Sequence, residues 1–246
     1  MSQAPAALVT GASKRLGKAM AEYLHTRGYR VIIHYGGSAV DAQALETQFN
    51  TRRDNSATAI QADLSNADCI SGLARASLAQ WGRLDLLINN ASMFQADTDT
   101  FDSDLWQKQT TINSMAPYAL ARHLQQALNQ SGGNIINMVD IYADRPLAEH
   151  HSYCVSKAGI NMLVKSLAIE LAPHVRVNGI APGAILWPDN QSDISNNDYQ
   201  QALLSKIPLK KLGSVEAIVS ALAFILDCDY LNGQVINIDG GRSITI

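Results

Sequence analysis

LVTGASKRLGKAM, residues 8–20, joins a short apolar run to an amphipathic segment through a turn that holds Gly11 and Gly17. Between a strand and a helix, such a turn directs free backbone N–H groups and the positive end of the helix dipole toward one point, where a phosphate can bind. The usual dinucleotide-binding fingerprint has a third glycine in this turn, at the position that Arg15 takes here. The stretch therefore predicts a strand, a phosphate-binding turn and a helix, with a plain strand-to-helix turn as the alternative.

Six further runs of apolar and β-branched residues follow at regular intervals. Most are apolar on both faces, which is typical of strands in a parallel sheet covered by helices. The segments between them fit helices of about 12–30 residues, which connect parallel strands by right-handed crossovers. We expect an α/β fold, a single-domain Rossmann-like doubly wound fold with a seven-stranded parallel sheet, over residues 1–246. The expected strands are residues 6–12, 30–35, 57–63, 85–91, 133–140, 175–183 and 234–241.

One stretch after the sixth expected strand has little pattern. AILWPDNQSDISNNDYQQ, residues 184–201, is rich in Asp, Asn and Ser. Such a segment suits a mobile loop over a ligand site. We predict a substrate lid at about residues 184–206.

The composition excludes several classes of protein. Of the 246 residues, 47% are apolar and 17% are charged, and the net charge is −3. That charge gives no reason to expect nucleic acid or an anionic membrane as a partner. Cys69, Cys154 and Cys228 have no metal-binding spacing and are interpreted as reduced thiols, so no metal is expected. With no signal peptide pattern and no apolar run near about 18 residues, we expect a cytoplasmic protein.

The end of the second expected strand bears on which dinucleotide binds. NAD-binding proteins commonly have an acid there, for the ribose 2′-hydroxyl. This chain instead continues His34, Tyr35, Gly36, Gly37, Ser38, with no acid to repel a 2′-phosphate, and Lys14 can supply positive charge. The sequence favours NADPH, although two glycines in a mere loop would leave the cofactor open.

The third expected strand ends in a residue with two possible roles. The carboxylate of Asp63 and the N–H of Leu64 can bind the adenine edge. Alternatively, Asp63 is the N-cap of a helix that begins near Asn66.

Tyr153 and Lys157 stand four residues apart on an expected helix and so project from one face. A tyrosine is a poor acid at neutral pH, with a pKa of about 10, but a nearby ammonium lowers that pKa. This pair also occurs by chance on amphipathic helices. Asn113, in the helix after the fourth strand, can hold a water or expose a carbonyl near Lys157, or it is simply solvated. Asp140 lies thirteen residues before Tyr153.

Over nearly its whole length the chain resembles the short-chain dehydrogenases/reductases. The shared motifs are TGxxxxxG at 10–17, NNAS at 89–92, Asn113, the Tyr153/Lys157 pair, RVNGIAPG at 176–183 and DGG at 239–241. Within that superfamily it is most similar to the pteridine reductases. They share TGASKRLG with Arg15, HY after the second strand, QADLS, NNASxF with Phe94, and INMVD with Asp140 in place of a serine.

The resemblance implies an NADPH-dependent pteridine reductase, generally a homotetramer, that transfers hydride to a ring imine of a dihydropterin, an oxidised pterin or dihydrofolate. Asp140, Tyr153 and Lys157 would be catalytic, and Arg15, Ser92, Phe94 and Tyr153 would bind the substrate. A carboxylate suits a C=N substrate whose nitrogen must be protonated. The implied and inferred cofactor contacts are Gly11, Lys14, Arg15, Leu16, His34, Tyr35, Ser38, Asp63, Leu64, Asn90, Ala91, Ser92, Asn113, Lys157, Pro182 and Gly183.

One departure and several alternatives remain. Eukaryotic pteridine reductases carry a basic residue after HY, so here the 2′-phosphate must rely on Lys14, His34, Ser38 or the backbone. Phe94 could instead belong to the core, and Asp140 could cap a loop. The other functions considered are a generic carbonyl reductase for 3-oxoacyl, sugar or steroid substrates, and a non-catalytic dinucleotide-binding regulatory protein.

Overall fold

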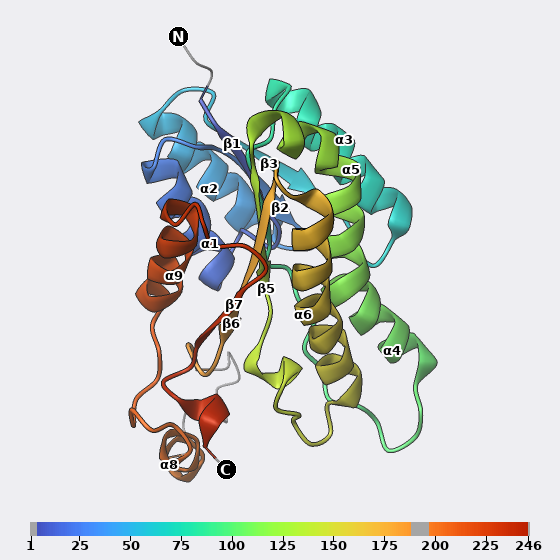
Figure 1. The fold of residues 1–246 in the computed structure, drawn as a ribbon, viewed down its shortest axis with the longest axis vertical. Helices are drawn as coiled ribbons and strands as arrows, with labels where there is room; N and C mark the ends of the chain where they lie inside the picture. Colours follow the sequence, from blue (N-terminus) through green and yellow to red (C-terminus); the bar gives the residue numbers. More distant parts are fainter. Residues whose placement is uncertain (1–3, 188–196, 246) are drawn as a thin grey trace.

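Seven parallel strands form one sheet in the order β3-β2-β1-β4-β5-β6-β7 (Figure 1). The computed structural model describes residues 4–187 and 197–245. All seven expected strands are present, and the doubly wound α/β fold is confirmed. The strands are β1 (Ala6–Val9), β2 (Arg30–Tyr35), β3 (Ala57–Gln61), β4 (Leu86–Asn89), β5 (Asn134–Met138), β6 (Arg176–Pro182) and β7 (Val235–Ile238).

Helices cover both faces of the sheet (Figure 1). In the figure, α1, α2 and α9 lie on one side, and α3, α5 and α6 lie on the other. The α-helices are α1 (Arg15–Thr26), α2 (Ala39–Arg52), α3 (Ala67–Trp81), α4 (Ser103–Thr110), α5 (Ala116–Ser131), α6 (His151–Leu171), α8 (Asn197–Ser205) and α9 (Val215–Asp227). The short helical turns are the π-helix η1 (Thr111–Met115) and the 3-10 helices η2 (Ile141–Ala143) and η3 (Arg242–Ile244).

The central strands are apolar on both faces because each face has its own core. Along β1, Ala7 and Val9 belong to the cluster under α1, α2 and α9, whereas Leu8 between them belongs to the cluster under α3, α5 and α6. All four residues of β1 are buried. Alternate side chains of a strand point to opposite faces, so a strand covered on both sides needs apolar residues throughout.

The carboxyl ends of β1 and β4 are neighbours at the point where the strand order reverses. Ligands of open α/β sheets bind in the crevice at such a point. Here the two loops are tied together. The Thr10 hydroxyl accepts hydrogen bonds from the backbone N–H groups of Asn90 and Ala91, both at 2.9 Å. The Asn90 amide donates to the carbonyls of Thr10 and Gly11, at 2.8 and 3.1 Å. The crevice therefore has fixed walls.

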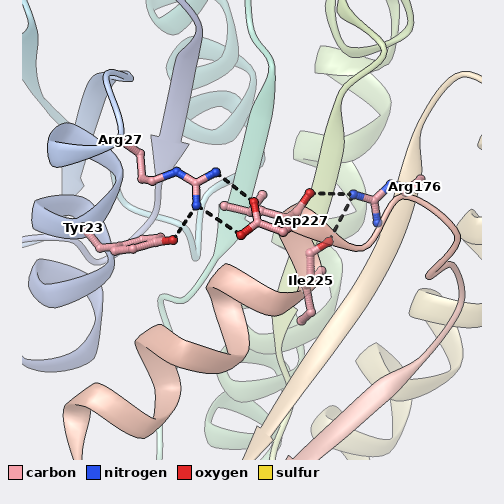
Figure 2. A network of polar contacts seen from close by, with 6 residues as sticks. Tyr23, Arg27, Arg176, Ile225 and Asp227 are labelled. Atoms are coloured by element: carbon pink, nitrogen blue, oxygen red, sulfur yellow. Dashed lines mark hydrogen bonds and ion pairs between the residues drawn. The ribbon is translucent and has the colours of Figure 1, made fainter.

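Two arginines fasten α9 to the rest of the molecule (Figure 2). Arg27 at the end of α1 donates to Asp227 and to the Tyr23 hydroxyl, both at 2.8 Å. This ion pair is exposed, and such pairs stabilise a fold only by about 0–1 kcal/mol. Arg176 of β6 is half-buried and donates to the Leu231 and Ile225 carbonyls, at 2.8 and 3.1 Å. Because carbonyls at a helix end lack partners within the helix, Arg176 provides the stronger attachment.

Within the described residues, no helix is long and apolar enough to cross a membrane, and no cluster of side chains could hold a metal ion. The predicted lid falls partly outside them, since residues 188–196 are not described. Of the lid, the structure places residues 184–187 after β6, and it places α8 at 197–205.

Candidate active site

Three connected cavities line the carboxyl edge of the sheet. The first, of about 400 Å³, lies beside Gly36, Gly37 and Asp63, and shares Gly11 and Ser92 with the second. The second, of about 390 Å³, surrounds the start of α1. It shares Arg15, Leu16, Asn90 and Ser92 with the third, of about 250 Å³. The cavities form a groove that runs from the end of β3 to the loop after β6, which we call the edge groove. Its shape suits an extended ligand such as a dinucleotide.

Most of the predicted site residues line the edge groove, and four do not. Tyr35 is half-buried and packs against the core under α1, α2 and α9, and its predicted cofactor contact stays a prediction. Ser38, Phe94 and Asn113 stand beside the groove and are described below. The predicted residues that line it are Gly11, Lys14, Arg15, Leu16, His34, Asp63, Leu64, Asn90, Ala91, Ser92, Asp140, Tyr153, Lys157, Pro182 and Gly183.

The start of α1 is suited to bind an anion. Lys14, the N-cap residue, has an extended backbone and makes no side-chain capping hydrogen bond, and the first turn has no acid. The first N–H groups of the helix therefore lack a side-chain cap and face the groove. Gly11 has a φ of 62°. A Cβ atom at Gly17 would lie 2.2 Å from the Gly11 carbonyl oxygen, so this close turn requires glycine.

Arg15, in the slot of the third glycine, connects the phosphate end to the third cavity. Its φ of 51° is a left-handed conformation that costs a non-glycine residue free energy. Its guanidinium donates to the Trp187 carbonyl at 3.3 Å. Arg15 lines both the second and the third cavity. A cation here can contact a cofactor phosphate and a substrate together, as the resemblance implied.

His34 holds the backbone together rather than facing a phosphate as a charged group. Its Nδ1 accepts a hydrogen bond from the Gly11 N–H, and its Nε2 donates to the Ala62 carbonyl, both at 3.1 Å. Burial lowers the pKa of His34 to about 4, against a smaller opposite effect of the bond to Ala62. The ring is therefore neutral at pH 7, so any contact of His34 with a 2′-phosphate would be that of an uncharged ring.

Lys14 and Ser38 were also predicted to contact a 2′-phosphate, and both lie near the start of a helix. The Lys14 ammonium lies 3.1 Å from the Asp41 carboxylate, and both side chains are exposed. Ser38 is the N-cap residue of α2, and its hydroxyl makes no capping hydrogen bond. A phosphate can use this hydroxyl and helix end, while Asp41 competes for Lys14.

Asp63 lines the first cavity and is not an N-cap. Its carboxylate accepts hydrogen bonds from the Ser65 hydroxyl at 2.7 Å and the Ser65 N–H at 2.9 Å, and these bonds lower the pKa of Asp63. The N-cap of α3 is Asn66, whose side chain accepts from the Asp68 and Cys69 N–H groups. The alternative interpretation of Asp63 was therefore wrong.

At the other end of the edge groove, three titratable side chains meet. The Tyr153 hydroxyl donates to an Asp140 carboxylate oxygen at 2.8 Å. The Lys157 ammonium donates to the Met138 carbonyl at 2.9 Å and lies 5.6 Å from the centre of the Tyr153 ring. Tyr153 and Lys157 are buried on one face of α6. Asp140 follows β5, and its other oxygen accepts from the Tyr142 N–H at 2.9 Å.

The electrostatics of this group differ from the sequence-based expectation. Burial, together with the Asp140 charge and hydrogen bond, raises the pKa of Tyr153 above its ordinary value. Burial also raises the pKa of Asp140, against its bonds to Tyr142 and Tyr153 and the charge of Lys157. The pKa of Lys157 falls to about 8 for the same reason. The expectation that Lys157 lowers the pKa of Tyr153 does not hold here, because a carboxylate is in direct contact with the hydroxyl. Tyr153 is therefore protonated at neutral pH, and its hydroxyl donates a hydrogen bond to Asp140.

An exposed aromatic side chain stands beside this group. Phe94 is 57% exposed, which excludes ordinary core packing. Its ring stacks on His150, with centroids 4.6 Å apart, and meets Tyr153 edge-on at 4.7 Å. An exposed ring held by two aromatic neighbours can bind a flat ligand.

Asn113 is buried within the π-helix η1 and connects the loop after β4 to α6. Its amide exchanges two hydrogen bonds with the Met93 backbone, at 2.8 and 2.9 Å, and it also bonds the hydroxyls of Ser92 and Ser156. The interpretation as a solvated residue was wrong. A π-helix turn inside an α-helical segment often marks a functional site.

The sequence interpretation missed Asp97. Its carboxylate accepts hydrogen bonds from the N–H groups of His151 and Ser152 and from the Ser152 hydroxyl, at the start of α6. Burial would raise the pKa of Asp97, but these bonds hold it below its ordinary value, so the cap is charged at neutral pH. The only sequence signal was that α6 begins without a local capping residue, since His150 makes no side-chain cap.

Asp97→Ala is expected to lower the free energy of unfolding by about 1 kcal/mol, the usual contribution of a cap. Tm should fall by roughly 2–4 °C and kcat should fall as well, because Tyr153 lies in the first turn of α6. Thermal unfolding and turnover measure the two effects. Asp99→Ala, in the same exposed loop but without a bond to α6 among the described residues, is the control. Equal Tm values for the two variants would contradict this role.

A buried tyrosine and lysine in the third cavity, at one end of a groove long enough for a dinucleotide, are typical of an oxidoreductase that uses a nicotinamide dinucleotide.

Comparison with known proteins agrees with an oxidoreductase. Residues 11–243 match a family model described as enoyl-(acyl carrier protein) reductase. The chain is 35% identical to pteridine reductase 1 of Leishmania tarentolae, over 98% of this chain and 97% of that protein. It is 31% identical to a 3-oxoacyl-(acyl-carrier-protein) reductase of Staphylococcus aureus, over 98% and 99%. The chain belongs to the short-chain dehydrogenase/reductase family.

Proposed function

We propose that this oxidoreductase is an NADPH-dependent pteridine reductase, which reduces a ring imine of a dihydropterin, an oxidised pterin or dihydrofolate to the tetrahydro form. One observation carries the proposal: in the third cavity, the carboxylate of Asp140 accepts a hydrogen bond from the Tyr153 hydroxyl. Reduction of a ketone or of a ring imine adds one hydride and one proton, but the more basic imine nitrogen can take its proton before hydride transfer. A carboxylate beside the tyrosine supplies a second proton carrier for that purpose.

The residues of the edge groove fit the cofactor and the chemistry. The uncapped first turn of α1 and the glycine turn suit a pyrophosphate. Bound NADPH supplies the hydride for the imine carbon. Tyr153 gives its hydroxyl proton to the neighbouring ring nitrogen. Asp140, whose raised pKa lets it take up a proton from solvent more readily than an exposed carboxyl, then passes that proton to the Tyr153 oxygen. The Phe94 ring supports one face of the pterin, and Arg15 and Ser92 bind its edge.

NADPH rather than NADH is proposed because of the end of β2. This strand ends at Tyr35 and is followed by two glycines whose Cβ positions would meet nothing within 4 Å, so the space there is open. A 2′-phosphate would bind the Ser38 hydroxyl and the Lys14 ammonium, for which it would compete with Asp41. Since a hydrogen bond to a charged group contributes about 1.5–3 kcal/mol, we expect kcat/KM to favour NADPH by roughly tenfold or more.

A homotetramer in the cytoplasm is proposed as the working form. Tyr118 on α5 and Met162 and Ile169 on α6 are exposed apolar side chains on neighbouring helices, which suits burial against further copies. Cys69, Cys154 and Cys228 are all free thiols, which suits a reducing compartment.

A substrate panel tests the proposal. Purified protein is assayed by absorbance at the cofactor band with dihydrobiopterin, dihydromonapterin, dihydrofolate and acetoacetyl thioesters, each with NADPH and NADH. We expect turnover with one or more pterins or dihydrofolate and a preference for NADPH. Turnover of ketones alone would replace the proposal by a carbonyl reductase, in keeping with the similarity to the 3-oxoacyl reductase. No turnover in either class, with NADPH still bound, would favour a regulatory protein.

A further inference from the structure

The C-terminal turn packs against the segment that carries Asp140. Arg242, the first residue of η3, donates from Nη2 to the Tyr142 hydroxyl at 2.8 Å, and its guanidinium carbon lies 5.5 Å from the centre of the Tyr142 ring. The Asp239 carboxylate, at the end of β7, accepts from the backbone N–H of Ser243 at 2.7 Å, which fixes the turn. Arg145 makes a second connection, from its Nε to the Ser243 carbonyl at 2.9 Å.

Tyr142 connects Arg242 to the catalytic carboxylate. Its backbone N–H donates to Asp140 Oδ1 at 2.9 Å, and Asp140 Oδ2 accepts from Tyr153 at 2.8 Å. Each carboxylate oxygen thus has its own donor, and the two donors come from different elements. Tyr153 comes from the buried face of α6, whereas Tyr142 lies in the short turn η2 and is half-buried. The turn η2 is held by the buried side chain of Ile141 and by its packing on α6, and Arg242 adds a hydrogen bond to the side chain of Tyr142.

We propose that Arg242 is a positioning residue, which holds the Asp140 carboxylate toward Tyr153 by anchoring Tyr142. The inference rests on the proposed function in one respect, the role of Asp140 in moving the proton. Nothing in the reaction requires Arg242 to touch the substrate or the cofactor, and it lies 102 residues after Asp140 in the chain.

The positive charge of Arg242 also stabilises the ionised form of Asp140. Burial raises the pKa of Asp140, and the Tyr142 N–H, Lys157, Tyr153 and the Arg242 charge oppose it. The groups that face Asp140 are therefore Tyr153 and Lys157 from α6 and Arg242 from η3. Tyr142 in turn faces Arg242, Asp140 and Tyr199 of α8. Loss of the Arg242 charge removes one stabilising contribution to the carboxylate form, so the pKa of Asp140 rises further.

Arg242→Gln is expected to lower kcat by about tenfold, because a small misplacement of a reacting group costs that much or more. The limb of the kcat–pH profile governed by Asp140 should move to higher pH, and KM for NADPH should not change. Arg242→Lys keeps the charge and should restore part of kcat and most of the pH profile. Tyr142→Phe should lose as much kcat as Arg242→Gln, and combining the two changes should add no further loss.

Arg145→Gln is the matched control, since Arg145 holds the same turn but bonds the backbone of Ser243 rather than Tyr142. It should leave kcat within about twofold of the unaltered protein. Equal losses in Arg145→Gln and Arg242→Gln would show that docking of the turn matters and not the guanidinium, which would overturn the inference. An unchanged kcat and pH profile in Arg242→Gln would also overturn it.

The unaltered protein is assayed first, so that the two proposals can fail separately. Absence of pterin turnover in it counts against the proposed function alone. The role of Arg242 is then tested without turnover, by following the titration of Asp140. NMR of carboxyl-labelled aspartate measures this titration, and the Asp140→Asn variant assigns the signal. The midpoint should rise in Arg242→Gln and stay constant in Arg145→Gln. A midpoint that stays constant in both variants would overturn the inference.

Discussion

Tyr153→Phe is expected to lower kcat for pterin reduction by about 10²–10⁴-fold, the usual contribution of a positioned acid. The change removes only the hydroxyl, which donates to Asp140 at 2.8 Å. The ring remains and keeps its edge contact with Phe94, so the wall of the substrate site is preserved. The NADPH dissociation constant, measured by cofactor fluorescence, should therefore not change.

The result separates a proton donor from a residue that only fills space. Tyr230→Phe, at a side chain that is 97% exposed, is the control and should behave as the unaltered protein does. Near-normal turnover of Tyr153→Phe would mean that the proton reaches the substrate nitrogen from another group. A loss of NADPH binding would mean that the hydroxyl supports the groove rather than the chemistry.

Gly17→Ala is expected to abolish productive cofactor binding and to destabilise the fold. The added Cβ atom would lie 2.2 Å from the Gly11 carbonyl oxygen and 2.6 Å from the Asn90 side-chain nitrogen. The first is a backbone atom in a loop fixed by Asn90, so it cannot move away at low cost. Overpacking of a well-packed site costs about 1–3 kcal/mol, and more where backbone must shift. At the upper value, Tm should fall by roughly 6–12 °C.

Gly72→Ala in α3 is the matched control for this change. A Cβ atom there would meet nothing within 4 Å, and alanine favours a helix over glycine by about 1 kcal/mol. Its Tm should be equal to or above that of the unaltered protein. Thermal unfolding with and without NADPH measures both effects, because a bound cofactor raises Tm. If Gly17→Ala still gains stability from NADPH as the unaltered protein does, the turn does not need to be as close as the structure indicates.

The fold could be predicted from the sequence because burial on both faces leaves a strong signal. The second strand was predicted at its observed bounds, Arg30–Tyr35. Others were predicted too long at their carboxyl ends. The first was expected to run to Ala12 but ends at Val9, and the fifth was expected to reach Asp140 but ends at Met138. Ala12 is fully buried although it lies in a loop. Apolar sequence marks burial rather than strand pairing, and the loops at this edge are buried around the groove.

The sequence could predict site residues only where they lie close together in the chain, because their spacing then shows which side chains share one face of a helix. Tyr153 and Lys157 follow from helical spacing, whereas the bond from Asp97 to the start of α6 joins residues 54 apart. The direction of the Tyr153 pKa shift was also beyond the sequence. It depends on which charge lies closer to the hydroxyl, and the structure places Asp140, not Lys157, in contact with it.

The buried ring of His34 limits the range of acidity in which the protein can work. Its pKa in the folded state, about 4, lies below the 6.5 of an exposed histidine, so the unfolded chain binds this proton more readily. The stability that His34 contributes is complete above pH 6.5 and is lost as the pH falls toward 4, with a difference of about 3 kcal/mol. Protonation would also remove the acceptor for the Gly11 N–H, in the turn that is proposed to bind the cofactor phosphate. If the proposed function holds, acid that favours protonation of the substrate nitrogen also weakens the turn at the start of α1, so the lower pH limit of activity would be set by His34.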